Sequence, residues 1–261
     1  MKIRILKIGG QILDDENLLV ETLKGFSVFP GPKLIIHGGG KLATQIGNRM
    51  GIPERYVDGR RITDAQTLEL VTMVYGGLIN KGLVAKIQSF GFNAIGLCGA
   101  DVGIIKAHKR PIGKINFEFV GDIEPEYIQT DFIELLLEKE IIPVFSSLTF
   151  DPKGSLLNTN ADTICSALGA KLAEKHEVDM YFCFDKDGVM NIDQTIYDRL
   201  NESQILELSE NGIVLGGMLP KLKNAIHAIK AGVKSVTVLS PTHLMDHLEG
   251  KPAIGTKITL N

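Results

Sequence analysis

The sequence is poor in cysteine and has no excess of basic residues, and both shortages argue against broad classes of protein. Its three cysteines, Cys98, Cys165 and Cys183, are far apart, and no Cys-x-x-Cys pair or Cys/His cluster occurs. This pattern disfavours a disulfide framework and a Cys/His zinc site. The formal net charge of -3 offers no basic footprint for nucleic acid and no polybasic segment for a membrane. We therefore expect a small-molecule partner.

Long apolar stretches are also missing. No run approaches the ~18 consecutive apolar residues of a membrane span. The first eight residues carry charges at Lys2, Arg4 and Lys7, and their apolar stretch is too short for a signal peptide. The sequence therefore predicts a cytoplasmic protein.

Short apolar, β-branched runs alternate with longer helical patterns along the 261 residues. The predicted strands are Ile3–Ile8, Leu34–His37, Ala94–Cys98, Ile142–Ser146, Met180–Phe184 and Ser235–Leu239. The predicted helices are Asn17–Phe26, Lys41–Met50, Asp64–Phe90, Glu126–Glu140, Ala161–Lys175, Glu202–Glu210, Pro220–Ala231 and Thr242–Leu248. Near-continuous apolar runs are typical of strands buried on both faces. We expect an α/β fold, a three-layer αβα sandwich with an open, mainly parallel central sheet.

Three local features refine this organisation. Two short strand-like runs, Ile104–His108 and Phe117–Val120, predict a hairpin inserted near residues 103–123. Thr63-Asp64-Ala65-Gln66 reads as a capping box. The length permits two packed lobes, and a boundary would fall near Lys175–Asp179.

The first strand ends in Lys7-Ile8-Gly9-Gly10. A lysine inside a buried strand is costly unless it faces an anion or a carboxylate. Gly9 and Gly10 would let backbone N–H groups approach a ligand closely. Because ligands bind beyond the carboxyl ends of strands in open α/β sheets, this strand end is a candidate anion site, although a solvated edge lysine would also fit.

The second strand ends in His37-Gly38-Gly39-Gly40 before a helix. Amides at such a junction form a nest at the positive end of the helix dipole. The stretch is not a Walker A loop, because Ile35 stands where that motif requires glycine and Leu42 follows Lys41. The pattern suits a phosphate or a carboxylate, and His37 reads as a packed strand-end residue.

A third glycine-rich segment ends in Pro220-Lys221 at a predicted helix start. A cation there opposes the helix dipole, so an anionic partner would explain Lys221 better than local stability does. Between the glycine segments, Asn160 is a good N-cap, and Asp162 suits the first turn of the next helix. We expect Asp162 to face both Lys7 and Lys221, although capping alone would also account for Asn160 and Asp162.

These motifs together resemble the amino acid kinase family, over nearly the whole chain. They occur in order: Lys7-Ile8-Gly9-Gly10, His37 to Gly40, Asp58-Gly59-Arg60-Arg61-Ile62-Thr63, Asn80-Lys81, Val120-Gly121-Asp122-Ile123, Asn158-Thr159-Asn160-Ala161-Asp162, Asp185-Lys186-Asp187-Gly188-Val189, and Gly217-Met218-Leu219-Pro220-Lys221. Arg61 and the Asn158-x-Asn160-Ala-Asp162 pattern favour the branch that phosphorylates acylated glutamate. The resemblance implies ATP-dependent phosphorylation of the side-chain carboxylate of N-acetyl-L-glutamate, in arginine biosynthesis.

The resemblance also implies a role for each site residue. Lys7 and Lys221 would stabilise the transferring phosphoryl group, and Asp162 would orient both lysines. The substrate would be held by Gly39, Gly40, Arg61, Asn158 and Asn160. The nucleotide would be held by Gly9, Gly10, Asp185, Lys186, Asp187, Gly188, Val189, Met190, Ile213, Val214, Leu215, Gly216 and Gly217. Residues 1–175 would form the acyl-amino-acid lobe and 176–261 the ATP lobe. Mg²⁺ would arrive with ATP, held mainly by phosphates and not by protein ligands.

Some positions depart from the family pattern near the expected acyl pocket. Leu97 to Asp101 and Ser146 to Phe150 differ there, so N-succinyl-L-glutamate would also fit as the substrate. A different amino acid kinase is a further alternative. A non-catalytic ligand sensor on the same fold would explain the glycine-rich strand ends but not the two separated lysines together with Asp162. In the family that the motifs resemble, arginine-inhibited hexameric members carry an extra N-terminal helix. This chain begins almost directly at the first strand, so the resemblance implies a homodimer insensitive to arginine.

Overall fold

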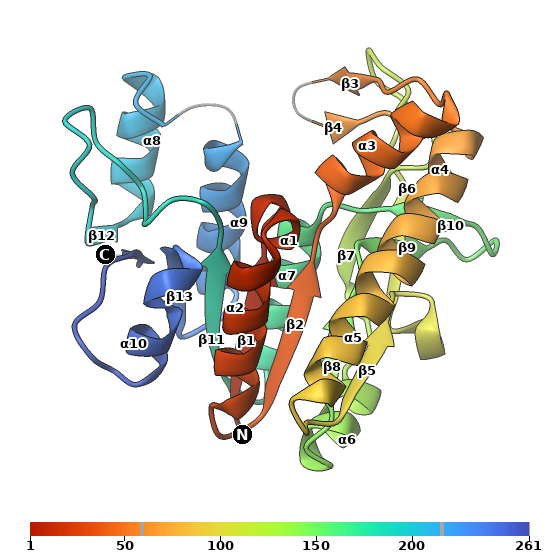
Figure 1. Cartoon of the computed structure of the whole chain (residues 1–261). Coiled ribbons are helices and arrows are strands. Elements are labelled where there is room, and N and C mark those ends of the chain that lie inside the picture. Colours follow the sequence, from red (N-terminus) through yellow and green to blue (C-terminus); the bar gives the residue numbers. More distant parts are fainter. Residues whose placement is uncertain (58–59, 215–216, 261) are drawn as a thin grey trace.

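The structure is a computed structural model that describes residues 1–57, 60–214 and 217–260. An eight-stranded sheet forms its centre (Figure 1). Across the sheet the strands are β12 (Arg199–Leu200), β14 (Thr256–Ile258), β13 (Ser235–Leu239), β11 (Glu177–Cys183), β1 (Lys2–Ile8), β2 (Lys33–His37), β8 (Ile142–Phe145) and β5 (Ala94–Leu97). Neighbouring strands run parallel except β13 and β14. The mainly parallel sheet predicted from the sequence is confirmed.

Helices cover both faces of this sheet. One face carries α6 (Asp131–Glu138), α7 (Ala161–Ala173), α8 (Glu202–Glu210) and α9 (Met218–Lys230). The other carries α1 (Gly10–Asp14), α2 (Glu16–Val28), α3 (Gly40–Met50), α4 (Ala65–Val71), the π-helical η1 (Thr72–Ile79), α5 (Asn80–Ser89) and α10 (Leu244–Leu248). Two 3₁₀ turns are η2 (Asp101–Gly103) and η3 (Pro241–His243). The three-layer αβα arrangement is therefore confirmed.

The central strands divide their side chains between two hydrophobic cores. In β1, Ile3 and Ile5 pack into the core beneath α7, whereas Leu6 and Ile8 pack into the core beneath α2. All four side chains are fully buried. Strand side chains alternate between faces, so a strand with helices on both sides must be apolar at nearly every position. Lys7 stands out against this background.

The predicted hairpin is present, but its second strand lies further along the chain than expected. A smaller, four-stranded sheet has the order β10-β9-β6-β7. Its strands are β6 (Ile105–Lys109), β7 (Gly121–Ile128), β9 (Leu148–Phe150) and β10 (Leu156–Asn158). The predicted helix Glu126–Glu140 is consequently wrong in its first residues, because β7 continues to Ile128. Ile128 pairs with Ile105 of β6, so these residues extend the antiparallel strand pair instead of starting the helix.

The predicted capping box is one residue out of place. Asp64, and not Thr63, caps α4, and its carboxylate accepts a hydrogen bond from the Thr67 N–H at 2.9 Å. The Thr63 hydroxyl instead accepts from Asn158 Nδ2 at 2.9 Å. A two-stranded hairpin, β3 (Tyr56–Val57) and β4 (Arg60–Arg61), precedes this helix start.

The continuous helical segment Ala65–Ser89 is long and apolar enough to cross a membrane, judged by length and composition only. Its apolar residues do not form one uninterrupted run, because polar and glycine residues lie between them. Val71, Leu83 and Ile87 on this segment are buried in the core beneath the sheet. Near its middle, Asn80 is buried and hydrogen-bonded. This segment therefore serves as a core helix of the α/β sandwich.

Candidate active site

Three charged side chains from distant segments meet at the carboxyl end of the central strands. The Lys7 Nζ atom lies 2.6 Å from Asp162 Oδ1, and the Lys221 Nζ atom donates to Asp162 Oδ2 at 3.0 Å. The exposed fractions of the side chains are 7% for Lys7, 6% for Asp162 and 24% for Lys221. The meeting that the sequence predicts is found, so one carboxylate carries two ammonium groups.

Each of the three positions has a local structural reason. Lys7 is the penultimate residue of β1, and Lys221 lies in the first turn of α9. Asp162 lies in the first turn of α7, where the Asn160 side chain accepts from the backbone N–H groups of Asp162 and Thr163. A carboxylate is favoured at a helix N-terminus, and a lysine there is not. The ion pair with Asp162 therefore offsets the unfavourable position of Lys221.

Asp162 is held as an anion. Burial by itself raises the pKa of a carboxyl, but the nearby Lys7 and Lys221 outweigh burial and lower the pKa of Asp162 to about 2. Near neutral pH the two ammonium groups thus remain anchored to a fixed negative charge.

A cavity of about 290 Å³ opens beside this cluster. Every residue predicted to bind the acceptor lines it, together with all three members of the charged cluster: Gly39, Gly40, Arg61, Asn158, Asn160, Lys7, Asp162 and Lys221. The sequence did not identify several further lining residues: Tyr56, Arg60, Tyr75, Arg110, Asp122, Ser147 and Thr159. The cavity therefore has an anion-stabilising end and a wall rich in hydrogen-bond donors.

The glycine loop after β2 provides the backbone side of the cavity. Gly39 has φ of 154° and precedes Gly40, the first residue of α3. A Cβ atom at Gly39 would collide with the Ile79 side chain, so this position requires glycine. N–H groups in the first turn of a helix have no intrahelical acceptor, and the Gly40 amide is one of them. It is available to a carboxylate or phosphate.

His37 lies buried beneath this loop. Its ring is fully buried, with Nδ1 2.8 Å from the Gly38 carbonyl oxygen and Nε2 3.1 Å from Asn80 Nδ2. Burial lowers the pKa of His37 to about 4, so the ring is neutral near pH 7. The Ser147 hydroxyl donates to the His37 carbonyl at 2.7 Å. The sequence interpretation of His37 as a packed strand-end residue agrees with this geometry.

A second group of charges lies on the hairpin side of the cavity. The Arg110 Nε atom donates to both carboxylate oxygens of Asp122, at 3.2 and 3.0 Å. The pKa of Arg60 is lowered, first by its partial burial and second by the nearby positive charge of Arg110. Burial raises the pKa of Tyr75 to about 12, which keeps its hydroxyl protonated as a donor.

Residues 2–240 match the sequence model described as the amino acid kinase family. The chain belongs to the amino acid kinase family. A curated relative named acetylglutamate kinase, from Phocaeicola vulgatus, is 45% identical over 240 residues, which are 91% of this chain and 93% of the relative. A protein of the same name from Cytophaga hutchinsonii is 43% identical over 100% of this chain and 99% of its own.

A solved structure of carbamate kinase from Giardia lamblia, bound to AMP-PNP, has the same fold. Its TM-score is 0.71 at 15% identity, and the match covers 100% of this chain and 98% of that one. At this identity the likeness supports the fold alone. Family membership itself implies that ATP is the co-substrate.

Two groups of the residues expected to bind the nucleotide, Gly9-Gly10 and Asp185 to Asp187, follow the neighbouring strands β1 and β11. Asp185 to Asp187 are exposed just beyond β11, next to the end of β1. The side chains of Val189 and Val214 are buried in the core, so only their backbones could meet a nucleotide. Leu215 and Gly216 lie outside the described residues, as do Asp58 and Gly59 of the family motif.

One predicted role is wrong in detail. The Gly9 N–H donates to the Cys183 carbonyl of β11 at 2.9 Å and is not free for a phosphate. A Cβ atom at Gly9 would approach that same carbonyl oxygen to 3.0 Å. Gly9 therefore serves close strand packing, whereas Gly10, as the first residue of α1, keeps an amide without an intrahelical acceptor.

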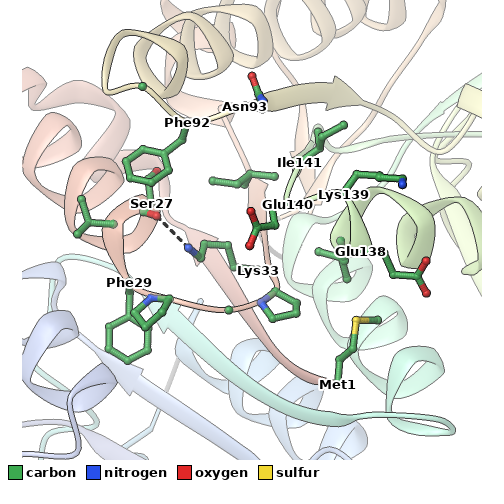
Figure 2. A pocket seen from close by; sticks show the side chains of 17 residues that line it. Met1, Ser27, Phe29, Lys33, Phe92, Asn93, Glu138, Lys139, Glu140 and Ile141 are labelled. Atoms are coloured by element: carbon green, nitrogen blue, oxygen red, sulfur yellow. Dashed lines mark hydrogen bonds between the residues drawn. The ribbon is translucent and has the colours of Figure 1, made fainter.

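A larger cavity, of about 560 Å³, lies at the opposite end of the sheet (Figure 2). It is lined by Met1 and Lys33, near the amino ends of β1 and β2. Lys33 is buried and its ammonium donates to the Ser27 carbonyl at 2.8 Å, in the last turn of α2. A cation is favourable at a helix C-terminus, so this lysine has a structural explanation. Cavity size alone would thus select the end of the sheet away from the charged cluster.

Proposed function

We propose that this amino acid kinase transfers the γ-phosphoryl group of ATP to the side-chain carboxylate of N-acetyl-L-glutamate, giving N-acetyl-L-glutamyl 5-phosphate in arginine biosynthesis. The observation that carries this proposal is the pair of ammonium groups held on Asp162 at one end of a cavity that Arg61 and the glycine loop line. The relatives named acetylglutamate kinase support the choice of acceptor.

In the proposed reaction the acceptor is fixed at both ends. Arg61 and Asn158 bind its α-carboxylate, and the amides of Gly39 and Gly40 position the rest of the molecule. A side-chain carboxylate oxygen then forms a bond to the γ-phosphorus while the bond from phosphorus to the ADP oxygen breaks. A carboxylate is already nucleophilic, so no general base is needed, and Lys7 and Lys221 stabilise the charge on the transferring group.

The magnesium ion would be held by ATP phosphates and water. Both oxygens of Asp162 face ammonium groups, and Asp122 is paired with Arg110, so these cavity carboxylates are already engaged. This donor set fits an ion that arrives with the nucleotide. When bound, Mg²⁺ would neutralise charge on the β- and γ-phosphates.

The two substrates would be bound by successive parts of the chain. Residues 1–175 would bind the acylated amino acid, since they supply most of the cavity wall. Residues 176–261 would bind ATP and contribute Lys221. β1 of the first part pairs with β11 of the second, so the two parts share one sheet.

A coupled assay of ADP release tests the function. We expect turnover with N-acetyl-L-glutamate and trapping of the acyl phosphate by hydroxylamine as a hydroxamate. Free glutamate should be a poor acceptor because it lacks the acyl group. Turnover of aspartate, carbamate or uridylate in preference to acylated glutamate would contradict the proposal and favour another member of the family.

A specific observation supports N-succinyl-L-glutamate as a second candidate acceptor. Among the described residues that line the cavity, positive side chains outnumber carboxylates by three: Lys7, Arg60, Arg61, Arg110 and Lys221 against Asp122 and Asp162. N-acetylglutamate has two carboxylates, and a succinyl group adds a third. This third carboxylate would lie near Arg60 and Arg110 on the hairpin side of the cavity, where guanidinium groups can bind it.

Replacing Arg110 distinguishes the two acceptors. In R110Q, kcat/KM for N-succinyl-L-glutamate is expected to fall by about 10-fold or more, because a charged hydrogen bond to the third carboxylate is lost. Turnover of N-acetyl-L-glutamate should change little. The measurement is a pair of kinetic titrations with each acceptor, on wild type and R110Q. Equal losses with both acceptors would contradict a succinyl-binding role for Arg110.

We further propose a cytoplasmic homodimer. β5 lies at the edge of the eight-stranded sheet, and Met73 and Leu78 on the adjacent helical segment are more than half exposed. An exposed sheet edge beside apolar side chains is suited to pairing with a second copy. The three cysteines are unpaired, which fits a reducing compartment.

A further inference from the structure

Arg61 is held by a set of four acceptors, two of which, the Gly40 carbonyl and the Tyr56 hydroxyl, belong to residues that also line the cavity. One guanidinium nitrogen, NH1, forms an ion pair with Glu54 Oε1. The other, NH2, lies 2.9 Å from the Gly40 carbonyl oxygen, 3.1 Å from Thr44 Oγ1 and 2.6 Å from the Tyr56 hydroxyl. The Arg61 side chain is only 6% exposed, so these partners fix its orientation.

Glu54 stands at the centre of this set. Its carboxylate also accepts a hydrogen bond from the Thr44 hydroxyl at 2.5 Å, and Thr44 lies on α3, the helix that begins at the glycine loop. The Glu54 side chain is 17% exposed. Glu54 therefore links the guanidinium of β4 to the helix whose first turn forms the backbone wall of the cavity.

The position of Glu54 shows whether its carboxylate competes with the substrate for Arg61 or only supports Arg61 from outside the cavity. A carboxylate inside the cavity would compete with the substrate for Arg61. Arg61, Gly40 and Tyr56 line the cavity, whereas Glu54 and Thr44 are not among its lining residues. Glu54 thus pairs with Arg61 from outside the cavity wall.

From this arrangement we infer that Glu54 is a positioning residue, which holds the Arg61 guanidinium so that its remaining N–H groups face the acceptor carboxylate. The inference rests on the proposed function. A buried guanidinium without a counter-charge is costly and would move toward solvent, whereas one fixed in advance loses little freedom when it binds. Glu54 therefore acts on acceptor affinity and not on the phosphoryl group.

The test compares E54A and E54Q with wild type by steady-state kinetics. We expect KM for the acylated glutamate to rise about 10-fold or more in E54A, with KM for ATP and kcat nearly unchanged. The amide of E54Q keeps an acceptor for Arg61 and Thr44 without the charge, so this variant should recover part of the loss. E118A is the matched control, since Glu118 pairs with Arg55 at 3.5 Å and not with Arg61; its acceptor KM should stay at the wild-type value.

A double variant separates positioning from general stability. In R61A the acceptor KM should rise more than in E54A, and adding E54A to R61A should raise it no further, because the group that Glu54 positions is gone. Additive effects, an unchanged acceptor KM in E54A, or an equal rise in KM for ATP would overturn the inference. An active wild type with an unaffected E54A would refute the role of Glu54 alone, whereas a wild type inactive on acylated glutamate would refute the proposed function as well.

Discussion

Replacing Lys7 or Lys221 with alanine is expected to lower kcat for acyl phosphate formation by at least ~10²-fold, the loss typical of removing one group that stabilises developing charge. Both ammonium groups are anchored on Asp162 beside the acceptor cavity. Charge on the transferring phosphoryl group must be neutralised by protein groups and the metal, since the protein does little covalent chemistry in this reaction. The measurement is the coupled assay of ADP release at saturating ATP and acceptor.

The matched control for K7A is Lys33, a second buried lysine at the start of the neighbouring strand. Lys33 donates to a carbonyl at the opposite end of the sheet, so K33M should lower the free energy of unfolding and leave kcat unchanged. Circular dichroism of K7A and K221A checks that the fold is retained. Wild-type turnover in both catalytic variants would instead favour a non-catalytic sensor on the same fold.

The charged cluster was predictable because both of its lysines occupy locally unfavourable positions. Lys7 is the one charged residue in the buried run 5–8 of β1, and Lys221 opposes a helix dipole. The cost of burying Lys7 and the cost of placing Lys221 at a helix N-terminus are both offset by the ion pairs with Asp162. Residues that contradict their local environment thus point to a partner elsewhere in the chain.

The remaining cavity residues carry no such signal. Glu54 and Arg110 are charged residues of ordinary appearance in segments that read as loops, and their importance lies in contacts with Arg61 and Asp122. Tyr75 reads as a core position on a helix. It lies in the π-helical η1, where Tyr75 and Ile79 both approach Gly39, and only this packing against the glycine loop places Tyr75 at the cavity.

The same distinction, between residues with a clear local signal and residues without one, explains which strands could be predicted. The long central strands are apolar on both faces, and their runs were visible in the sequence. β12, β14 and the two strands β3 and β4 have two or three residues each, too few to show a period. The role of Gly9 was wrong in detail for a related reason: a glycine at a strand end is equally suited to ligand approach and to strand packing, and only the pairing with Cys183 decides.

The pH dependence of stability tests the state of Asp162. Its pKa is about 2 in the folded protein, below the ordinary 3.8, because Lys7 and Lys221 outweigh the effect of burial. A lowered folded-state pKa contributes stability that is fully present above about pH 4 and is lost as the pH falls through about 2. The difference corresponds to about 2 kcal/mol at neutral pH. D162N removes this contribution at every pH.

Wild type and D162N are therefore expected to differ most in free energy of unfolding near pH 7 and to converge as the pH falls from 5 toward 2. D162N also leaves the buried Lys7 without a counter-charge, so the total loss near pH 7 is expected to be about 3–5 kcal/mol, a figure that includes the pH-dependent part. Urea unfolding at a series of pH values measures both effects. D185N, which alters an exposed acid beyond β11, is the control and should follow the wild-type pH profile. A constant gap between wild type and D162N down to pH 2 would show that Asp162 is not held as an anion by the two lysines.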